Sequence, residues 1–223
     1  MSGQIIKNMN KINLAIVDDH NLFRNGFKLL LNKSCSDLIN NLYEAQSGKE
    51  FLSLLREVDV DVALMDIAMP EMDGIETTSR AIALKRDLKI IALTMFNEDD
   101  YCLRMINAGA SGLILKDSGI KEVRLAIEKV LRGETHFPGN ILYQIIKNET
   151  VEEHISSINE LSEREIEILG FICRGLSNQE IADTLFLSKR TVDKHRSNIL
   201  FKTNCKNTAQ LVVFALKNKL VQM

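Results

Sequence analysis

Short apolar runs alternate with amphipathic stretches over the first 132 residues. Short apolar runs are typical of buried strands, and apolar residues that recur every three or four positions are typical of helices. The predicted strands are Ile12 to Val17, Ile39 to Ala45, Val60 to Met65, Lys89 to Thr94 and Ser111 to Leu115. The predicted helices are Asn21 to Asn32, Lys49 to Glu57, Ile75 to Lys85, Glu98 to Ala108 and Lys121 to Arg132. This alternation predicts an α/β fold, with a parallel sheet covered by helices on both faces.

The pattern changes after Arg132. The stretch from Gly133 to Ser157 contains Pro138 and several Asn and Glu residues, and its single apolar run predicts a helical segment at Asn140 to Lys147. Every later apolar run has helical spacing. We therefore predict an α/β domain over residues 10–132, a linker over 133–157 and an all-α domain over 158–223.

The composition is that of an ordinary globular protein, with 45% hydrophobic and 26% charged residues. No stretch approaches the roughly 20 apolar residues that cross a bilayer, and the N-terminus lacks the long apolar region of a signal peptide. We expect a cytoplasmic protein that has no membrane partner. The four cysteines are far apart and lack CxxC spacing, which favours reduced thiols over a zinc site or disulfides.

Charge is unevenly distributed along the chain. The stretch from Ile158 to the end has 10 basic and 7 acidic residues, which leaves 18 basic and 23 acidic residues for the remainder. A basic C-terminal part on an acidic body is a weak indication of a polyanionic partner.

Acidic side chains follow two of the predicted strands. Asp18 and Asp19 follow the first strand and Asp66 follows the third, while Thr94 ends the fourth strand and Lys116 follows the fifth. Ligands of open α/β sheets bind beyond the carboxyl ends of the strands. If the strand order is 2-1-3-4-5, the first and third strands are neighbours and the three carboxylates converge.

Three carboxylates in a partly dry site repel one another unless cations lie among them. Lys116 supplies one positive charge, and Mg²⁺ suits a site built from a few carboxylates and phosphoryl oxygens. Such a site can hold an aspartyl phosphate, because one carboxylate acts as the nucleophile while the metal and the lysine neutralise the phosphoryl group.

The segments IVDDH, MDIAMPEMDGIE, ALT and LILKD resemble the receiver domain of response regulators, and the resemblance covers about Asn10 to Arg132. It implies a CheY-like doubly wound five-stranded sheet and a sensor histidine kinase that phosphorylates Asp66. It implies that Thr94 and Lys116 contact the phosphoryl oxygens. The implied ligands of Mg²⁺ are Asp18, Asp19, Asp66 and the carbonyl oxygen of Ala68.

One position departs from this family. Many receivers carry an aromatic residue three positions before the lysine, and it rotates inward on activation, but this chain has Leu113 there. The usual coupling between the threonine and the aromatic residue is then weakened, or it is carried by Phe96 or Tyr101.

Local signals in the C-terminal part predict capped helices. Ser162 with Glu165, and Ser177 with Glu180, fit capping boxes. Gly175 fits a left-handed helix end, and Ser188 fits an N-cap. Two short helices joined by a tight turn, the second of them basic, are typical of a helix-turn-helix.

The segments LSEREIEIL, GLSNQEIADTLFLSKRTVDKHRSNIL and NTAQLVVFALKNKL resemble the LuxR-type helix-turn-helix of NarL/FixJ response regulators. The predicted partner is double-stranded DNA. Lys194 and Ser197 are expected to read the groove, and Arg190, Thr191 and Arg196 to contact phosphates. Lys202 completes the predicted DNA-binding set. The last helix is too apolar for one buried face, and the resemblance implies a homodimer when the protein is phosphorylated or bound to DNA.

Two other function classes fit parts of the pattern. An aspartyl-phosphate hydrolase uses the same nucleophile but needs a second Asp as general acid, and the residue two positions after Asp66 is Ala68. A regulator that works without phosphorylation would not need the complete acceptor site. The sequence therefore predicts a transcription regulator controlled by phosphorylation, and not an enzyme.

Overall fold

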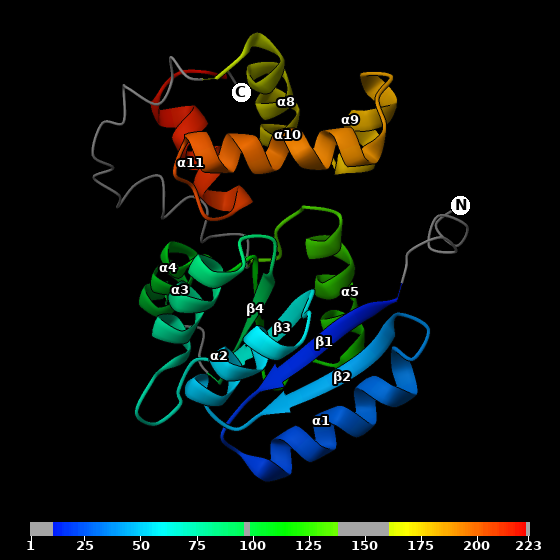
Figure 1. Ribbon diagram of the computed structural model, residues 1–223, viewed down its shortest axis with the longest axis vertical. Helices are drawn as coiled ribbons and strands as arrows, with labels where there is room; N and C mark the ends of the chain where they lie inside the picture. Colours follow the sequence, from blue (N-terminus) through cyan, green and yellow to red (C-terminus); the bar gives the residue numbers. More distant parts are fainter. Residues whose placement is uncertain (1–10, 96–98, 138–160, 222–223) are drawn as a thin grey trace.

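The computed structural model describes residues 11–95, 99–137 and 161–221, which form an α/β domain and a helical domain (Figure 1). The sheet has the order β2-β1-β3-β4-β5 and its strands are parallel, which confirms the predicted topology. The strands are β1 (Ile12–Val17), β2 (Ile39–Ala45), β3 (Val62–Asp66), β4 (Lys89–Thr94) and β5 (Gly112–Leu115).

Helices cover both faces of this sheet, as predicted. They are α1 (Asn21–Ser34), α2 (Gly48–Glu57), α3 (Gly74–Leu84), α4 (Asp99–Ala108) and α5 (Ile120–Leu131). Side chains alternate along β1, so that Leu14 packs in a cluster with α1 and α5, whereas Val17 packs in a cluster with α2 and α3. Each face of the sheet therefore has its own apolar core.

The third strand differs from its predicted bounds. It begins at Val62 and ends at Asp66, because Asp66 is in register with Leu93 of β4 and the pairing extends the strand. Val60 is fully buried although it precedes the strand, so its apolar character reports burial and not strand pairing. Asp66 is thus held by the sheet itself.

The second domain contains α8 (Glu163–Cys173), α9 (Asn178–Thr184), α10 (Lys189–Lys202) and α11 (Thr208–Lys217). Both predicted capping boxes are present, at Ser162 and at Ser177, and Ser188 caps α10. Gly175 has φ 82°, the left-handed conformation that a glycine adopts without strain. The helix-turn-helix prediction is confirmed at the level of its local geometry.

Two predictions fall on residues outside the described ranges, namely the helical segment at 140–147 and a switching role for Phe96. The domain limits at 132 and 158 stay predictions. Among the described helices, none combines the length and the apolar character that a bilayer crossing requires.

Candidate functional site

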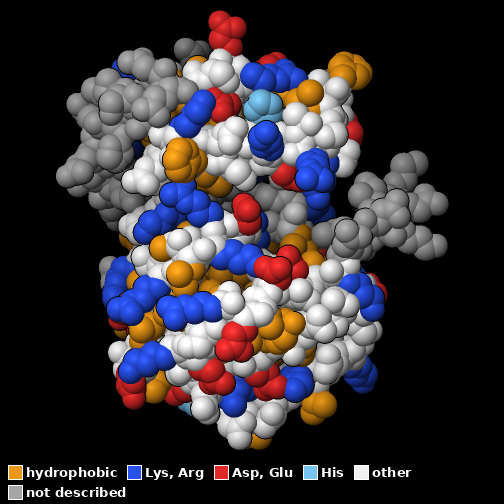
Figure 2. Space-filling view, in the orientation of Figure 1, with side chains coloured by type: hydrophobic (Ala, Val, Ile, Leu, Met, Phe, Trp, Pro, Cys, Tyr) orange, Lys and Arg blue, Asp and Glu red, His pale blue; other side chains and the backbone are white. Residues whose placement is uncertain are grey.

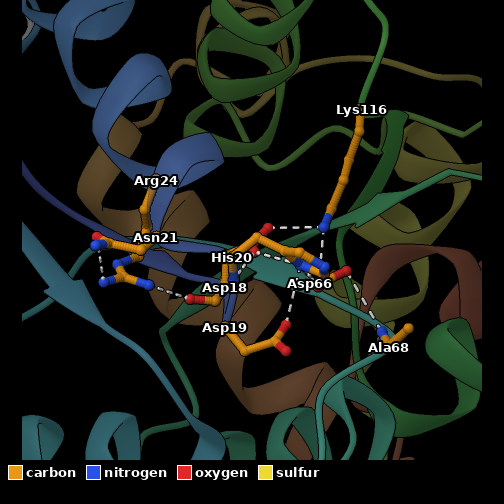
Figure 3. Close-up of polar contacts among 8 residues, drawn as sticks. All are labelled: Asp18, Asp19, His20, Asn21, Arg24, Asp66, Ala68 and Lys116. Atoms are coloured by element: carbon orange, nitrogen blue, oxygen red, sulfur yellow. Dashed lines mark hydrogen bonds and ion pairs between the residues drawn. The ribbon is translucent and has the colours of Figure 1, made fainter.

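Two buried carboxylates and one ammonium group meet at the carboxyl end of the sheet (Figure 3). Asp18 follows β1 and Asp66 ends β3, and these strands are paired neighbours. Lys116 Nζ lies 2.7 Å from Asp18 Oδ2 and 2.9 Å from Asp66 Oδ2. The parallel pairing therefore joins residues that are far apart in the sequence.

Burial and ion pairing act in opposite directions at this site. Burial raises the pKa of Asp66, the Lys116 ammonium lowers it and the Asp18 carboxylate raises it again, so that the net pKa lies above its ordinary value. Burial alone would lower the pKa of Lys116, but its bonds to Asp18 and Asp66 outweigh burial and raise that pKa. Lys116 therefore stays charged, and one ammonium neutralises only one of two carboxylates.

The remaining negative charge fits a divalent cation. Asp18, Asp19, His20 and Asp66 each offer a ligand atom, and these atoms lie within 4.8 Å of one another. Asp18 Oδ2 and Asp66 Oδ2 share the single Lys116 ammonium, and Asp19 Oδ1 lies beside His20 Nδ1. Hard cations such as Mg²⁺ prefer oxygen ligands of this kind. The Ala68 N–H lies 3.4 Å from Asp66 Oδ1, and the role of its carbonyl oxygen stays a prediction.

Sequence reasoning missed two neighbours of this cluster. His20 Nδ1 lies 3.2 Å from Asp19 Oδ1 and 3.3 Å from Asp18 Oδ1. Arg24 donates from Nη1 to the carbonyl oxygen of Asp18 at 2.7 Å, which fixes the chain after β1 (Figure 3). The position of His20 directly after two aspartates was a usable signal, whereas Arg24 lies within α1 and carried none.

An open pocket of about 310 Å³ adjoins Asp66. Thr94, which is buried at the end of β4, lines it as predicted. The other lining residues are His20, Ile67, Ala68, Asp73, Met95, Tyr101, Arg104 and Lys116. The pocket leaves room for a phosphoryl group between the carboxylate, the ammonium and the helix α4.

Leu113 does not line this pocket. It is 2% exposed and packs with Met105 of α4 and with Ala209 and Val213 of α11 in one apolar cluster. Tyr101 of α4 does line the pocket. Of the described candidates for coupling, Tyr101 is therefore the one beside the acceptor site.

Helix α10 carries most of the predicted DNA-contact residues. Arg190, Lys194 and Ser197 are exposed, and Thr191 is partly buried at the capped start of the helix. The Thr191 hydroxyl shares a hydrogen bond of 2.8 Å with Ser188 Oγ. The exposed members form a polar surface on one side of the helix.

The structure instead buries Arg196 and pairs Lys202, which is partly exposed, with a carboxylate of α8. Arg196 is 5% exposed and donates to Asn178 Oδ1 at 2.8 Å and to the carbonyl oxygen of Gly133. Burial lowers its pKa to about 10. Lys202 Nζ lies 2.7 Å from the buried Glu165 Oε2 of a capping box. These faces of α10 point toward other parts of the chain, so we leave both residues out of the proposed DNA contacts.

Two family models match this chain. The response regulator receiver domain matches residues 14–128, and the luxR family of bacterial regulatory proteins matches residues 159–215. The first match alone spans more than half of the chain. The chain belongs to the response regulator family.

Relatives of this response regulator match it over nearly its whole length. The transcriptional regulatory protein YxjL of Bacillus subtilis is 36% identical over 219 residues, which are 96% of this chain and 100% of YxjL. The response regulator protein VraR of Staphylococcus aureus is 36% identical over 214 residues, 95% of this chain and 99% of VraR. A solved LuxR-family two-component response regulator from Aurantimonas sp. has 29% identity and a TM-score of 0.56 over 62% of this chain and 97% of its own.

In this response regulator, α10 lies on the side of the helical domain that faces the receiver (Figure 1). Ser197 Oγ lies 3.5 Å from Asp87 Oδ1, which precedes β4. The Arg86 guanidinium of the receiver lies 4.9 Å from the ring centroid of Phe201. The surface that carries Lys194 and Ser197 is thus turned toward the receiver in this arrangement.

The same arrangement explains the apolar character of α11. Leu211 and Phe214 belong to the core of the helical domain. Ala209 and Val213 pack with Met105 of the receiver helix α4. One helix therefore buries two faces, and the second of them is covered by the receiver.

Proposed function

We propose that this response regulator accepts a phosphoryl group on Asp66 from a sensor histidine kinase and then regulates transcription by binding double-stranded DNA. The observation that carries the proposal is the contact between Asp66 and Lys116 beside an open pocket, in a chain that also has a luxR-type domain. The charge pattern and the pocket suit a phosphoryl acceptor. We place the protein in the cytoplasm, where it meets DNA.

The chemistry follows from the side chains around the pocket. The Asp66 carboxylate attacks the phosphorus atom, the phosphorus–nitrogen bond of the kinase phosphohistidine breaks, and the imidazole keeps the electron pair. Lys116 neutralises the phosphoryl oxygens and Thr94 supplies a hydroxyl at the pocket wall. Bound Mg²⁺, held by Asp18, Asp19, Asp66 and the Ala68 carbonyl, would neutralise the remaining charge.

Two features support a phosphoacceptor and not a hydrolytic enzyme. Ala68, two positions beyond Asp66, carries no acid or base that could protonate a leaving group. Lys116 is paired with both buried carboxylates and stabilises the anionic state instead of moving protons. The receiver is therefore suited to hold the phosphoryl group.

The DNA-binding surface of the proposal lies on α10. Lys194 and Ser197 would read base edges, while Arg190 and Thr191 would contact phosphates. A homodimer would form on phosphorylation or on DNA, with the second face of α11 as one surface that becomes available.

An Asp66→Asn variant tests the acceptor assignment. With acetyl phosphate and Mg²⁺, the wild-type protein should shift on a Phos-tag gel and gain DNA affinity, whereas Asp66→Asn should do neither. Asp59→Asn is the matched control, because this exposed carboxylate lies near the opposite end of the sheet and pairs with Lys85. Stoichiometric labelling of Asp66→Asn would exclude Asp66 as the acceptor, and rapid turnover of acetyl phosphate by the wild type would favour a hydrolase.

A further inference from the structure

A cavity of about 510 Å³ lies between the two domains, at the end of the sheet opposite Asp66. Its walls come from the amino ends of β4 and β5, the turn at Gly133, and α9, α10 and the start of α11. The volume is in the range of small-molecule sites. Figure 2 shows Lys and Arg side chains on both sides of the boundary between the domains.

Cations outnumber carboxylates on the walls of this cavity. The carboxylates are Asp87, Glu134 and Asp193. The cations are Arg86, Lys89, Arg190, Lys194, Arg196 and Lys206. Glu134 is already paired with Arg132 at 2.7 Å, and Asp193 accepts a hydrogen bond from the Asn178 amide. Within the described part of the chain, none of the six cations has a carboxylate oxygen within 4.0 Å.

Among the cations of the cavity, Lys89 gives the strongest argument for a bound anion. It is the first residue of β4, and among the described residues its ammonium has no hydrogen-bond or ion-pair partner. Burial lowers the pKa of Lys89, and the nearby Arg196 guanidinium lowers it further. Burial also lowers the pKa of Arg196. Asp193 lies close enough to both groups to raise their pKa values, but this attraction does not outweigh burial. Two cations thus share a partly buried space in which their charge is compensated only in part.

An anion in the cavity would relieve this repulsion, as a divalent cation would at the opposite end of the sheet. Guanidinium groups bind phosphate oxygens through paired hydrogen bonds, and an ammonium adds a point charge. Cations from both domains face the same space, so one compact ligand that carries several charges can reach both. A single chloride ion would balance only one of them.

We propose that the interdomain cavity binds a small oligophosphate, such as pyrophosphate, which bridges Lys89 and Arg86 of the receiver to Arg190 and Lys194 of α10. Bound there, the anion would hold the domains together. It would also occupy the cations assigned to DNA, and this second consequence rests on the proposed function. The ligand would therefore act as an antagonist of DNA binding.

Isothermal titration calorimetry of the unphosphorylated full-length protein tests the site. The titrant is sodium pyrophosphate in EDTA, so that no metal complex forms at the acidic cluster. We expect saturable binding with a Kd below about 1 mM. Lys89→Gln should weaken it about tenfold, the loss of one charged contact. Lys121→Gln, an exposed lysine of α5, is the matched control and should bind like the wild type.

A second variant keeps the test valid if Lys89→Gln does not fold. Arg86→Gln removes an exposed cavity cation and should also weaken binding, with an unchanged circular dichroism spectrum. The absence of saturable heat, or equal affinity for the wild type and both cavity variants, overturns the proposal.

A DNA titration separates this inference from the proposed function. Pyrophosphate should weaken DNA binding by the wild type more than NaCl of matched ionic strength does, and Lys89→Gln should lose this difference. If the protein binds pyrophosphate but never binds DNA, the proposed function fails while the anion site stands. If pyrophosphate binds and DNA affinity follows ionic strength alone, the antagonism is refuted.

Discussion

The side-chain amide of Asn207 in the helical domain donates a hydrogen bond of 2.8 Å to the main-chain carbonyl oxygen of Ala110 in the receiver. The same amide donates to the carbonyl oxygen of Ile106 at 2.8 Å. The Asn207 Oδ1 atom accepts from the Gln210 N–H and so caps α11. One buried side chain therefore begins the last helix and also ties it to the end of α4.

Loss of this tie should release α10. Asn207→Ser keeps an oxygen that can cap α11 and removes both donors to the receiver. The two lost hydrogen bonds contribute about 1 kcal/mol each to the arrangement in which α10 faces the receiver. Together they correspond to a factor of about 30, so we expect the unphosphorylated variant to bind DNA up to about 30-fold more tightly than the wild type. Fluorescence anisotropy with a labelled operator measures this. Asn25→Ser on the exposed surface of α1 is the control, and unchanged affinity of Asn207→Ser would argue against the tie.

The acyl phosphate should be long-lived. Hydrolysis needs an oriented water molecule near phosphorus, and Ala68, two positions after Asp66, lines the pocket with a methyl group that cannot orient water. We expect a half-life on the order of tens of minutes or longer, since the Ala68 position supplies no polar side chain to orient water. Ala68→Asn should shorten the half-life while Ala68→Val preserves it, as followed by release of inorganic phosphate. A half-life of seconds for the wild type would refute this account.

The two kinds of DNA contact on α10 should separate experimentally. Lys194→Ala should weaken binding to the cognate site by about 1–3 kcal/mol and change sequence preference, because it removes a base contact. Arg190→Ala should weaken all sites alike and flatten the salt dependence, because it removes a phosphate contact. Binding to cognate and random DNA at several salt concentrations measures both effects. Equal losses on random DNA would contradict this division.

The isolated fragment 158–223 tests occlusion by the receiver. Its core of Ile168, Leu169, Ile181, Val192 and Phe214 lies within the helical domain, so the fragment should fold. Without the receiver, the side of α10 that carries Lys194 and Ser197 no longer faces another domain, and the fragment should bind operator DNA at least as well as the resting full-length protein. Much weaker binding by the fragment, together with tight dimeric binding by the phosphorylated protein, would mean that the receiver supplies dimerisation.

Phosphorylation should shift the equilibrium between two arrangements of the domains. In the closed one, seen in this structure, α10 faces the receiver, and in the open one the domains are apart. The acceptor pocket includes Tyr101 and Arg104 of α4, and the far end of α4 contacts Asn207. We therefore expect a gain in DNA affinity of about 10- to 100-fold, or roughly 1–3 kcal/mol. DNA titrations of the resting and phosphorylated proteins measure it, and a gain that persists undiminished in Asn207→Ser would rule out this route.

Features with local causes were predictable from the sequence by itself. The capping boxes at Ser162 and Ser177 depend on residues three positions apart, and the bounds of β1, β2 and β4 follow from short apolar runs. The acidic cluster was predictable as well, because the carboxyl ends of parallel neighbouring strands meet at one edge. Alternation of strands and helices predicted a parallel sheet, and the resemblance to receiver domains supplied its strand order.

Only the tertiary structure decided which side chains face a neighbouring element. Arg196 and Lys194 lie on the same basic helix, yet Arg196 is buried against Asn178 whereas Lys194 is exposed. Lys89 begins an ordinary strand, and Asn207 fits an ordinary helix cap. Asn207 also donates to carbonyl oxygens about 100 residues away in the sequence, and Lys89 faces a cavity that the other domain helps to line. Local patterns determine helices and strands, whereas the burial of a charge depends on which distant surface packs against it.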